Sequence, residues 1–133
     1  MTEGNVERVK RVYTAWNAHD WDQVVAETAP DHVLQLTGLL PGLKPEYHGH
    51  EGMREFLTAF DAIWTDLQVK IERIEDAGDR VVACVLLCGK TTGSGVPVSI
   101  EYAHVFHLRD DLAVRTEGYR TWQEALDAAG VPG

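Results

Sequence analysis

A histidine and a glutamate in the last third of the chain have the residue types that proton transfer needs. Segment 98–121, VSIEYAHVFHLRDDLAVRTEGYRT, has a strand-like run on each side of Asp110 and Asp111. If these aspartates form a two-residue hairpin turn, the register places His104 opposite Glu117. Glu117 could then orient the imidazole, whose other nitrogen would take or give a proton. The same pair could equally be a buried, mutually satisfied contact without chemistry.

The same register places Tyr102 opposite Tyr119, one step along the face that carries His104. Their hydroxyl groups could donate hydrogen bonds to a ligand carbonyl, or the rings could simply pack as a cross-strand pair. On the opposite face it pairs Glu101 with Arg120, two opposite charges that stabilise a sheet. Asp-Asp is a less favourable turn pair than Asn-Gly or Asp-Gly, and a slip by one residue would move every side chain to the other face.

Other histidines do not form a recognisable metal site. His48 and His50 flank Gly49, but their spacing to His104 or His107 matches no standard zinc pattern. The sequence also has no Ser–His–Asp order, phosphate-binding glycine loop or redox CxxC motif. We therefore expect neither a metal nor a cofactor.

Composition indicates one globular domain over residues 1–133. The chain carries a net charge of −9 and 44% hydrophobic residues, which argues against nucleic-acid binding and against disorder. No segment is long and apolar enough for a membrane span, and the N-terminus has no signal-peptide core. Cys84 and Cys88 lie too far apart on one strand to form a disulfide with each other, so we expect reduced thiols and a cytoplasmic protein.

Hydrophobic periodicity changes from helical to alternating along the chain, which predicts an α+β fold with helices on one face of a curved antiparallel sheet. The expected helices cover residues 5–18, a short segment capped by Asp20, residues 52–64, and a last segment capped by Thr121; the expected strands cover residues 33–36, 67–71, 80–88 and the two arms of the hairpin. Pro30 is expected to end the second helix, and His32 to lie in a turn.

Aromatic residues recur at helical spacing and could line a pocket between helices and sheet. They are Tyr13, Trp16, Phe60 and Trp64, and such a stripe could equally be plain core. The run VVACVLLC predicts a strand that is buried on both faces. One layer of helices covers only one face, so we expect a homodimer that packs through the outer face of the sheet.

The order of the elements, the junction YHGHEGMREFLTAF and the closing GYRTWQEALDAAG resemble a known family. They are similar to the SnoaL-like polyketide cyclase and ketosteroid-isomerase-like family, within the nuclear transport factor 2-like superfamily. The resemblance covers nearly the whole chain. It implies a single SnoaL-like domain over 1–133, whose fold is a cone-shaped curved antiparallel sheet wrapped around N-terminal helices and enclosing a pocket. Its members include enzymes and proteins without chemistry, so the fold alone does not give the function.

Residue by residue, the resemblance to the isomerases places their general base at Leu36, which would then be part of the pocket wall. Their oxyanion tyrosine falls on Val12, beside Tyr13, and a second tyrosine falls on Leu57. Their buried protonated aspartate falls on His104. Three of these four positions are apolar here, and enolisation needs a base and hydrogen-bond donors, so steroid isomerisation is disfavoured.

The resemblance to the cyclases implies a histidine and an acid on neighbouring late strands, as His104 and Glu117 would be. We therefore expect the protein to bind a small hydrophobic carbonyl compound, and a cofactor-free isomerase or cyclase with His/Glu acid–base chemistry is one candidate function. The alternative is a non-catalytic ligand-binding or accessory protein. An epoxide hydrolase is less well supported, because no aspartate is predicted on an inward face. The predicted catalytic residues are His104 and Glu117; the predicted substrate-binding residues are Tyr13, Trp16, Leu36, Phe60, Trp64, Tyr102 and Tyr119.

Overall fold

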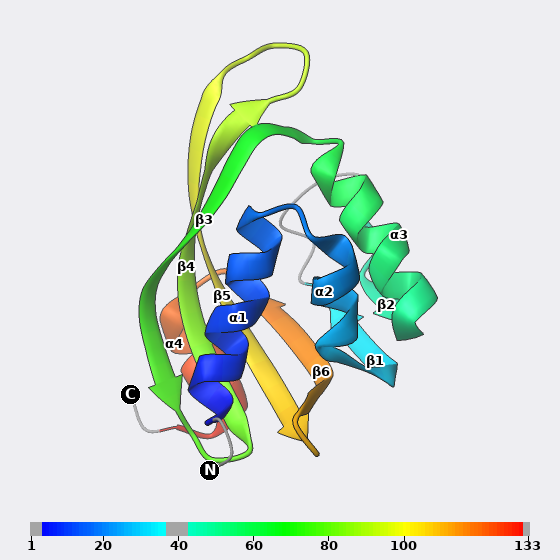
Figure 1. The fold of residues 1–133 in the computed structure, drawn as a ribbon. Coiled ribbons are helices and arrows are strands. Elements are labelled where there is room, and N and C mark those ends of the chain that lie inside the picture. Colours follow the sequence, from blue (N-terminus) through cyan, green and yellow to red (C-terminus); the bar gives the residue numbers. More distant parts are fainter. Residues whose placement is uncertain (1–3, 37–42, 132–133) are drawn as a thin grey trace.

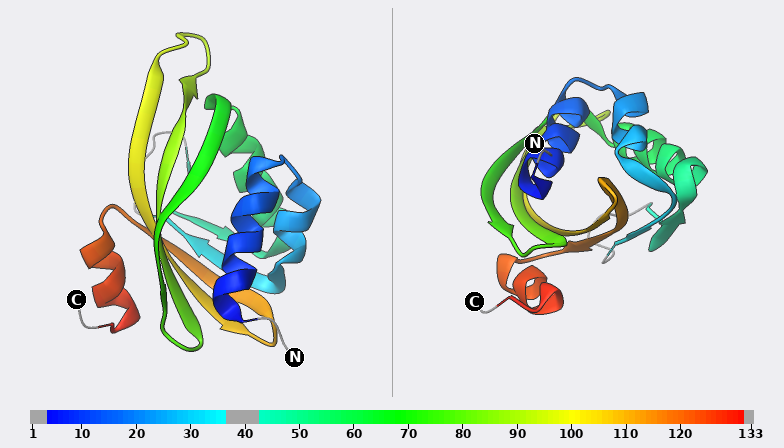
Figure 2. Two further views of the ribbon diagram at one scale, coloured as in Figure 1. Left: turned by 60° about the vertical axis from the view of Figure 1, so that its left-hand side comes forward. Right: turned by 60° about the horizontal axis from the view of Figure 1, so that its bottom comes forward.

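The computed structural model describes residues 4–36 and 43–131. Over these residues, a six-stranded curved sheet forms the frame of the protein, with three helices on its concave side and one on its convex side (Figures 1 and 2). The elements are α1 (Asn5–Asn17), α2 (Trp21–Ala26), β1 (Thr28–Gln35), β2 (Glu46–His48), α3 (Gly49–Asp61), β3 (Trp64–Asp76), β4 (Arg80–Thr91), β5 (Pro97–Arg109), β6 (Leu112–Tyr119) and α4 (Trp122–Ala129). The strand order is β2-β1-β6-β5-β4-β3. This arrangement confirms the predicted α+β class and the curved sheet around N-terminal helices.

Local sequence signals set the helix ends as predicted. The Asp20 side chain accepts a hydrogen bond from the Gln23 N–H at 3.2 Å, and Thr121 accepts one from the Glu124 N–H at 3.1 Å. Each of these bonds satisfies a backbone donor that has no partner within its helix. Gly130, with a φ of 74°, ends α4 in the left-handed conformation.

Several predicted boundaries differ from the structure; the helix expected from residue 52, for example, begins at Gly49, and the strand expected over 67–71 spans Trp64–Asp76. Helix α3 ends at Asp61, so Trp64 begins β3 instead of closing the helical stripe. The Trp64 ring is nevertheless buried, with its centroid 6.1 Å from that of Phe60. Trp64 therefore fits the apolar pattern of the helix although it lies beyond the helix end. Strand β1 begins at Thr28, so Pro30 does not end α2 but lies within the strand. The pairing with β6 is irregular between Thr28 and Val33, which lets the strand accept a residue without an N–H.

The last hairpin differs from its predicted register by one residue. Asp110 and Asp111 have φ values of 52° and 70°, as a tight two-residue turn requires, and the first residue pairs beyond the turn lie as predicted. Val114 is then an extra residue in β6 that has no partner on β5. Because of this bulge, His104 pairs with Gly118 rather than with Glu117.

Every residue of β6 beyond the bulge is consequently on the face opposite to the one we predicted. The pairing of Tyr102 with Tyr119 is therefore wrong, because Tyr119 pairs with Ala103. The pairing of Glu101 with Arg120 is also wrong: Glu101 pairs with Leu86 of β4, and Arg120 follows the end of β6.

The outer face of the sheet is partly covered by the chain itself. Helix α4 packs Ala125, Leu126 and Ala129 against Val82, Ala103 and Val105, and Figure 2 shows this helix outside the curve of the sheet. Strand β4 is thus buried on both faces over much of its length, as predicted. On the outer face, however, part of the cover comes from helix α4 of the same chain. The homodimer stays a prediction.

Cys84 and Cys88 are free thiols, as expected. Over the described residues, no helix combines the length and the apolar character that crossing a membrane requires.

Candidate functional site

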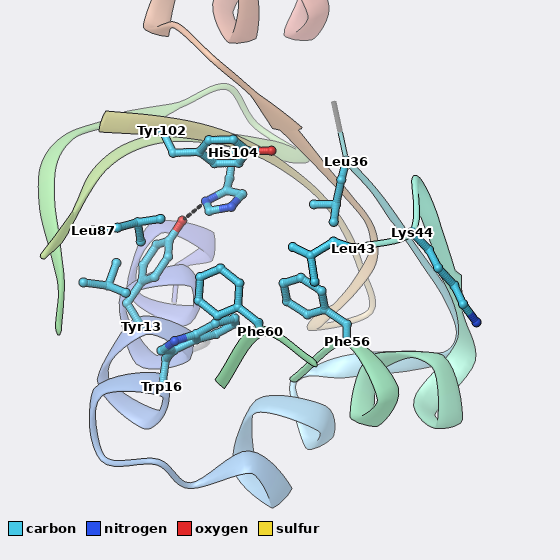
Figure 3. A pocket seen from close by; sticks show the side chains of 11 residues that line it. Tyr13, Trp16, Leu36, Leu43, Lys44, Phe56, Phe60, Leu87, Tyr102 and His104 are labelled. Carbon is cyan, nitrogen blue, oxygen red and sulfur yellow. Dashed lines mark hydrogen bonds between the residues drawn. The ribbon is translucent and has the colours of Figure 1, made fainter. Parts of the chain in front are cut away.

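An aromatic cavity lies between the concave face of the sheet and helices α1 and α3 (Figure 3). It encloses about 580 Å³, its open mouth included. Its walls are Tyr13, Trp16, Leu36, Leu43, Lys44, Phe56, Phe60, Val69, Leu87, Tyr102 and His104. The helices contribute residues of their buried stripes and the strands contribute inward-facing residues, so the curvature of the sheet is what creates the space.

His104 is the central polar residue of this cavity. It projects inward from β5, and its Nδ1 lies 2.8 Å from the hydroxyl oxygen of Tyr13 on α1 (Figure 3). The imidazole is held among aromatic rings, with centroids 5.1 Å from Tyr102 and 5.9 Å from Phe106. These contacts fix the orientation of the ring.

Three polar atoms of the cavity lining have no protein partner among the described residues. One of them, Trp16 Nε1, is completely enclosed. His104 Nε2 and the Tyr102 hydroxyl also make no hydrogen bond there, and neither atom is completely enclosed. Both therefore keep surface that a small molecule in the cavity can reach. Such sparse polar groups in an apolar cavity are typical of ligand sites.

The Tyr13–His104 pair is electrically neutral near pH 7. Burial lowers the pKa of His104 from 6.5 to about 4, because the interior disfavours the imidazolium. Burial, followed by the effect of Cys84, raises the pKa of Tyr13 well above its usual 10.0.

The tautomer follows from this neutrality. Nδ1 is the only hydrogen-bond partner of Tyr13 among the described residues, so the phenol satisfies its proton by donating to Nδ1. The imidazole proton is then on Nε2, and Nε2–H is a donor that faces the cavity.

Glu117 lies on the other face of the sheet, so its predicted pairing with His104 is wrong. It accepts hydrogen bonds from Arg115 at 2.9 Å and from Tyr119 at 3.1 Å, and its partner histidine is His107, at 3.1 Å. Partial burial acts to raise the pKa of Glu117, but the bonds from Arg115, His107 and Tyr119 outweigh it and lower the pKa. The bulge at Val114 separates this outer cluster from the cavity.

The structure brings together most of the predicted ligand-binding residues. Tyr13, Trp16, Leu36, Phe60, Tyr102 and His104 line the cavity. Tyr119 does not, because it lies on the outer face, and Trp64 is buried in the core beside the cavity wall. Phe56, which the prediction omitted, could have been found because it precedes Phe60 by one helical turn. Leu87 and Val69 could not have been identified in this way. Alternation along a strand shows which residues face inward, but it does not show whether an inward residue lines a cavity or fills the core.

The remaining histidines have structural partners. His48 is exposed beside Glu46, and His50 contacts the Thr28 carbonyl oxygen at 2.8 Å. His32, predicted to lie in a turn, is fully buried in β1 and contacts Thr116.

Possible metal-ligand atoms gather at one place on the outer face. Within the described part of the chain, only Glu72, Cys84 and Glu101 bring three such atoms within 4.8 Å of one another. Burial and Glu101 raise the pKa of Cys84 to about 11, which disfavours the thiolate that a metal needs.

Comparison with known proteins agrees with this fold. The profile of the family described as SnoaL-like domain matches residues 9–116, so the chain belongs to that family. No curated protein is significantly similar to the chain in sequence.

Solved structures with the same fold include three that cover nearly the whole chain. An NTF2-like protein of unknown function from Burkholderia pseudomallei has 22% identity and a TM-score of 0.81 over 95% of this chain and 97% of that one. TerC, co-crystallised with polyporic acid, has 22% identity and a TM-score of 0.79 over 92% and 98%. A protein with a ketosteroid isomerase-like fold from Catenulispora acidiphila, in complex with trimethylamine, has 20% identity and a TM-score of 0.76 over 95% and 94%.

Gly118 is predicted to be essential for the cavity wall. A Cβ atom there would lie 2.7 Å from Cε2 and 2.8 Å from Cζ of Tyr102, and closer still to its hydroxyl oxygen. Gly118→Ala should therefore displace Tyr102 and lower the free energy of unfolding by about 1–3 kcal/mol in urea titrations. Gly4→Ala, whose new Cβ would meet no atom within 4 Å, is the comparison variant; because Gly4 is the N-cap of α1, it should cost at most about 1 kcal/mol. A loss in Gly118→Ala no greater than that in Gly4→Ala would show that Tyr102 does not pack on Gly118.

Stability is predicted to fall with acidity between pH 6.5 and 4. Burial is the main cause that lowers the pKa of both His104 and His32 from 6.5 to about 4. In this interval the unfolded chain binds more protons than the folded one, so the free energy of unfolding decreases as the pH falls, by at most about 3 kcal/mol per histidine. Urea titrations from pH 7.5 to 4.5 measure the slope, and His104→Gln should reduce it. A flat profile would contradict the burial of both rings.

Proposed function

We propose that the protein binds a small, uncharged, hydrophobic molecule with a carbonyl group, and that His104 donates a hydrogen bond to the carbonyl oxygen. The observation that carries the proposal is the free Nε2 of His104 in an aromatic cavity, with Nδ1 held by Tyr13 at 2.8 Å. Tyr102, whose hydroxyl also has no partner among the described residues, is a second donor beside it.

The lining of the cavity supports an uncharged ligand. No acidic residue lines it among those described, and Lys44, at the rim, pairs with Glu55. Figure 3 shows the Lys44 side chain directed away from the aromatic rings. Burying a charged group here without a partner would be costly, whereas flat apolar rings pack well against aromatic walls.

The chemistry available to this site is polarisation of the carbonyl. A fixed neutral donor stabilises negative charge that develops on the oxygen during enolisation, and it does so without reorganising solvent. A cofactor-free isomerase or cyclase would thus use His104 with Tyr13 and Tyr102; Glu117 has no part in this mechanism.

A non-catalytic binding or accessory protein is the second candidate, because the interior position that lowers the pKa of His104 makes its imidazole a weak base. An enzyme and a binding protein would hold the ligand in the same geometry. They differ in that only the enzyme converts the ligand into a product. An epoxide hydrolase gains no support, since no carboxylate among the described residues lines the cavity.

Similar structures that contain small molecules support a ligand-binding role. TerC was co-crystallised with polyporic acid, and the Catenulispora protein is in complex with trimethylamine.

The proposal predicts selective binding of ketones. In NMR titrations, acetophenone should bind more tightly than benzoate, whose charge is unpaired in the cavity. His104→Phe keeps an aromatic ring but removes the donor, and should weaken acetophenone binding about five- to tenfold, the loss expected for one neutral hydrogen bond.

Isopropylbenzene provides the matched control, because it has nearly the shape of acetophenone without the oxygen. Its affinity should be unchanged in His104→Phe, and the same spectra report whether the variant is folded. Benzoate binding as tightly as acetophenone, or acetophenone binding equally to both proteins, would refute the proposal.

A further inference from the structure

A second space beside the aromatic cavity is lined by Thr116, together with Ala113 and Phe106. The two spaces share Tyr13, Trp16, Leu36, Phe56 and His104 as lining residues. They therefore adjoin each other at His104, and a molecule that contacts His104 lies close to the space that Thr116 lines.

A completely enclosed histidine lies behind Thr116. His32 is 1% exposed, and its Nε2 lies 2.8 Å from Thr116 Oγ1. Its other nitrogen, Nδ1, is buried and has no partner among the described residues. We assign the proton of the neutral ring to Nε2, which donates it to Oγ1, because the other tautomer would place an N–H at the enclosed, unpartnered Nδ1.

This tautomer determines what the Thr116 hydroxyl can do. Oγ1 accepts the proton of His32, and its own proton finds no acceptor among the described residues. Thr116 lines the space that adjoins the cavity. We propose that Thr116 donates a hydrogen bond to a second oxygen of the ligand, that His32 is the residue that positions it, and that the ligand therefore carries two acceptor oxygens.

The sheet sets the separation of the two donors. His104 pairs with Gly118, and Phe106 pairs with Thr116. His104 and Thr116 are therefore diagonal neighbours on one face, with side chains that begin about 7 Å apart. A diketone or another compound with two carbonyl-type oxygens at opposite edges of a flat apolar body fits this spacing. The inference rests on the proposed function, since it concerns the same ligand.

Two matched ketones test Thr116 as a donor in NMR titrations. 1,3-Diacetylbenzene carries two carbonyl oxygens, and 3-isopropylacetophenone has a similar shape with one. Thr116→Val, which keeps the shape but removes the hydroxyl, should weaken binding of the diketone about five- to tenfold and change binding of the monoketone less than about twofold. Thr116→Ser should retain the preference for the diketone.

His32 is tested by rescue. His32→Leu removes the donor to Oγ1 and should reduce the preference for the diketone, whereas His32→Gln, whose amide can still donate, should keep it. A purely structural His32 would change both affinities together. If a His32 variant does not fold, the comparison of Thr116→Val with Thr116→Ser still tests whether Thr116 donates to the ligand.

The possible outcomes separate this inference from the proposed function. If His104→Phe weakens both ketones but Thr116→Val changes them equally or not at all, Thr116 is not a ligand donor and only this inference fails. If neither ketone binds to the unmodified protein, the proposed function fails and the inference with it.

Discussion

The hydrogen bond between Tyr13 and His104 connects helix α1 to the centre of the sheet, and the interpretation of the cavity depends on it. Each partner restricts the other: the phenol fixes the tautomer of the imidazole, and the imidazole gives an acceptor to a buried hydroxyl. Because both groups are neutral, the pair avoids the cost of burying a charge. The result is a directed donor, Nε2–H, in a space that otherwise favours apolar ligands.

The sheet divides the polar residues of the protein into two kinds. Its concave face has the neutral donors His104, Tyr102 and Thr116, whereas its outer face has the charged cluster around Glu117. The division suits each environment, since charged side chains on the outer face remain partly in water. It also means that a cavity reaction cannot use the carboxylate of Glu117.

Much of the fold was predictable from the sequence, because local rules determine it. The stripe that includes Tyr13 and Trp16 predicts α1, and the caps Asp20 and Thr121 predict where two helices begin. The single-residue bulge at Val114 was not predictable, because turn chemistry and alternation do not encode where an extra residue is accommodated. That one residue moved Glu117 and Tyr119 out of the predicted site, while His104 and Tyr102, on the other strand, remained in it. Thr116 and His32 were missed because their partnership depends on the same shift and on the long-range pairing of β1 with β6.

The most direct test of the central claim is the ¹⁵N NMR spectrum of the histidine ring nitrogens near pH 7, with His104 assigned through His104→Gln. The structure predicts a neutral His104 with its proton on Nε2 and an unprotonated Nδ1 that accepts the bond from Tyr13. In Tyr13→Phe, this single tautomer should be replaced by a mixture of the two. A positively charged His104 at pH 7, or a proton on Nδ1, would contradict the account.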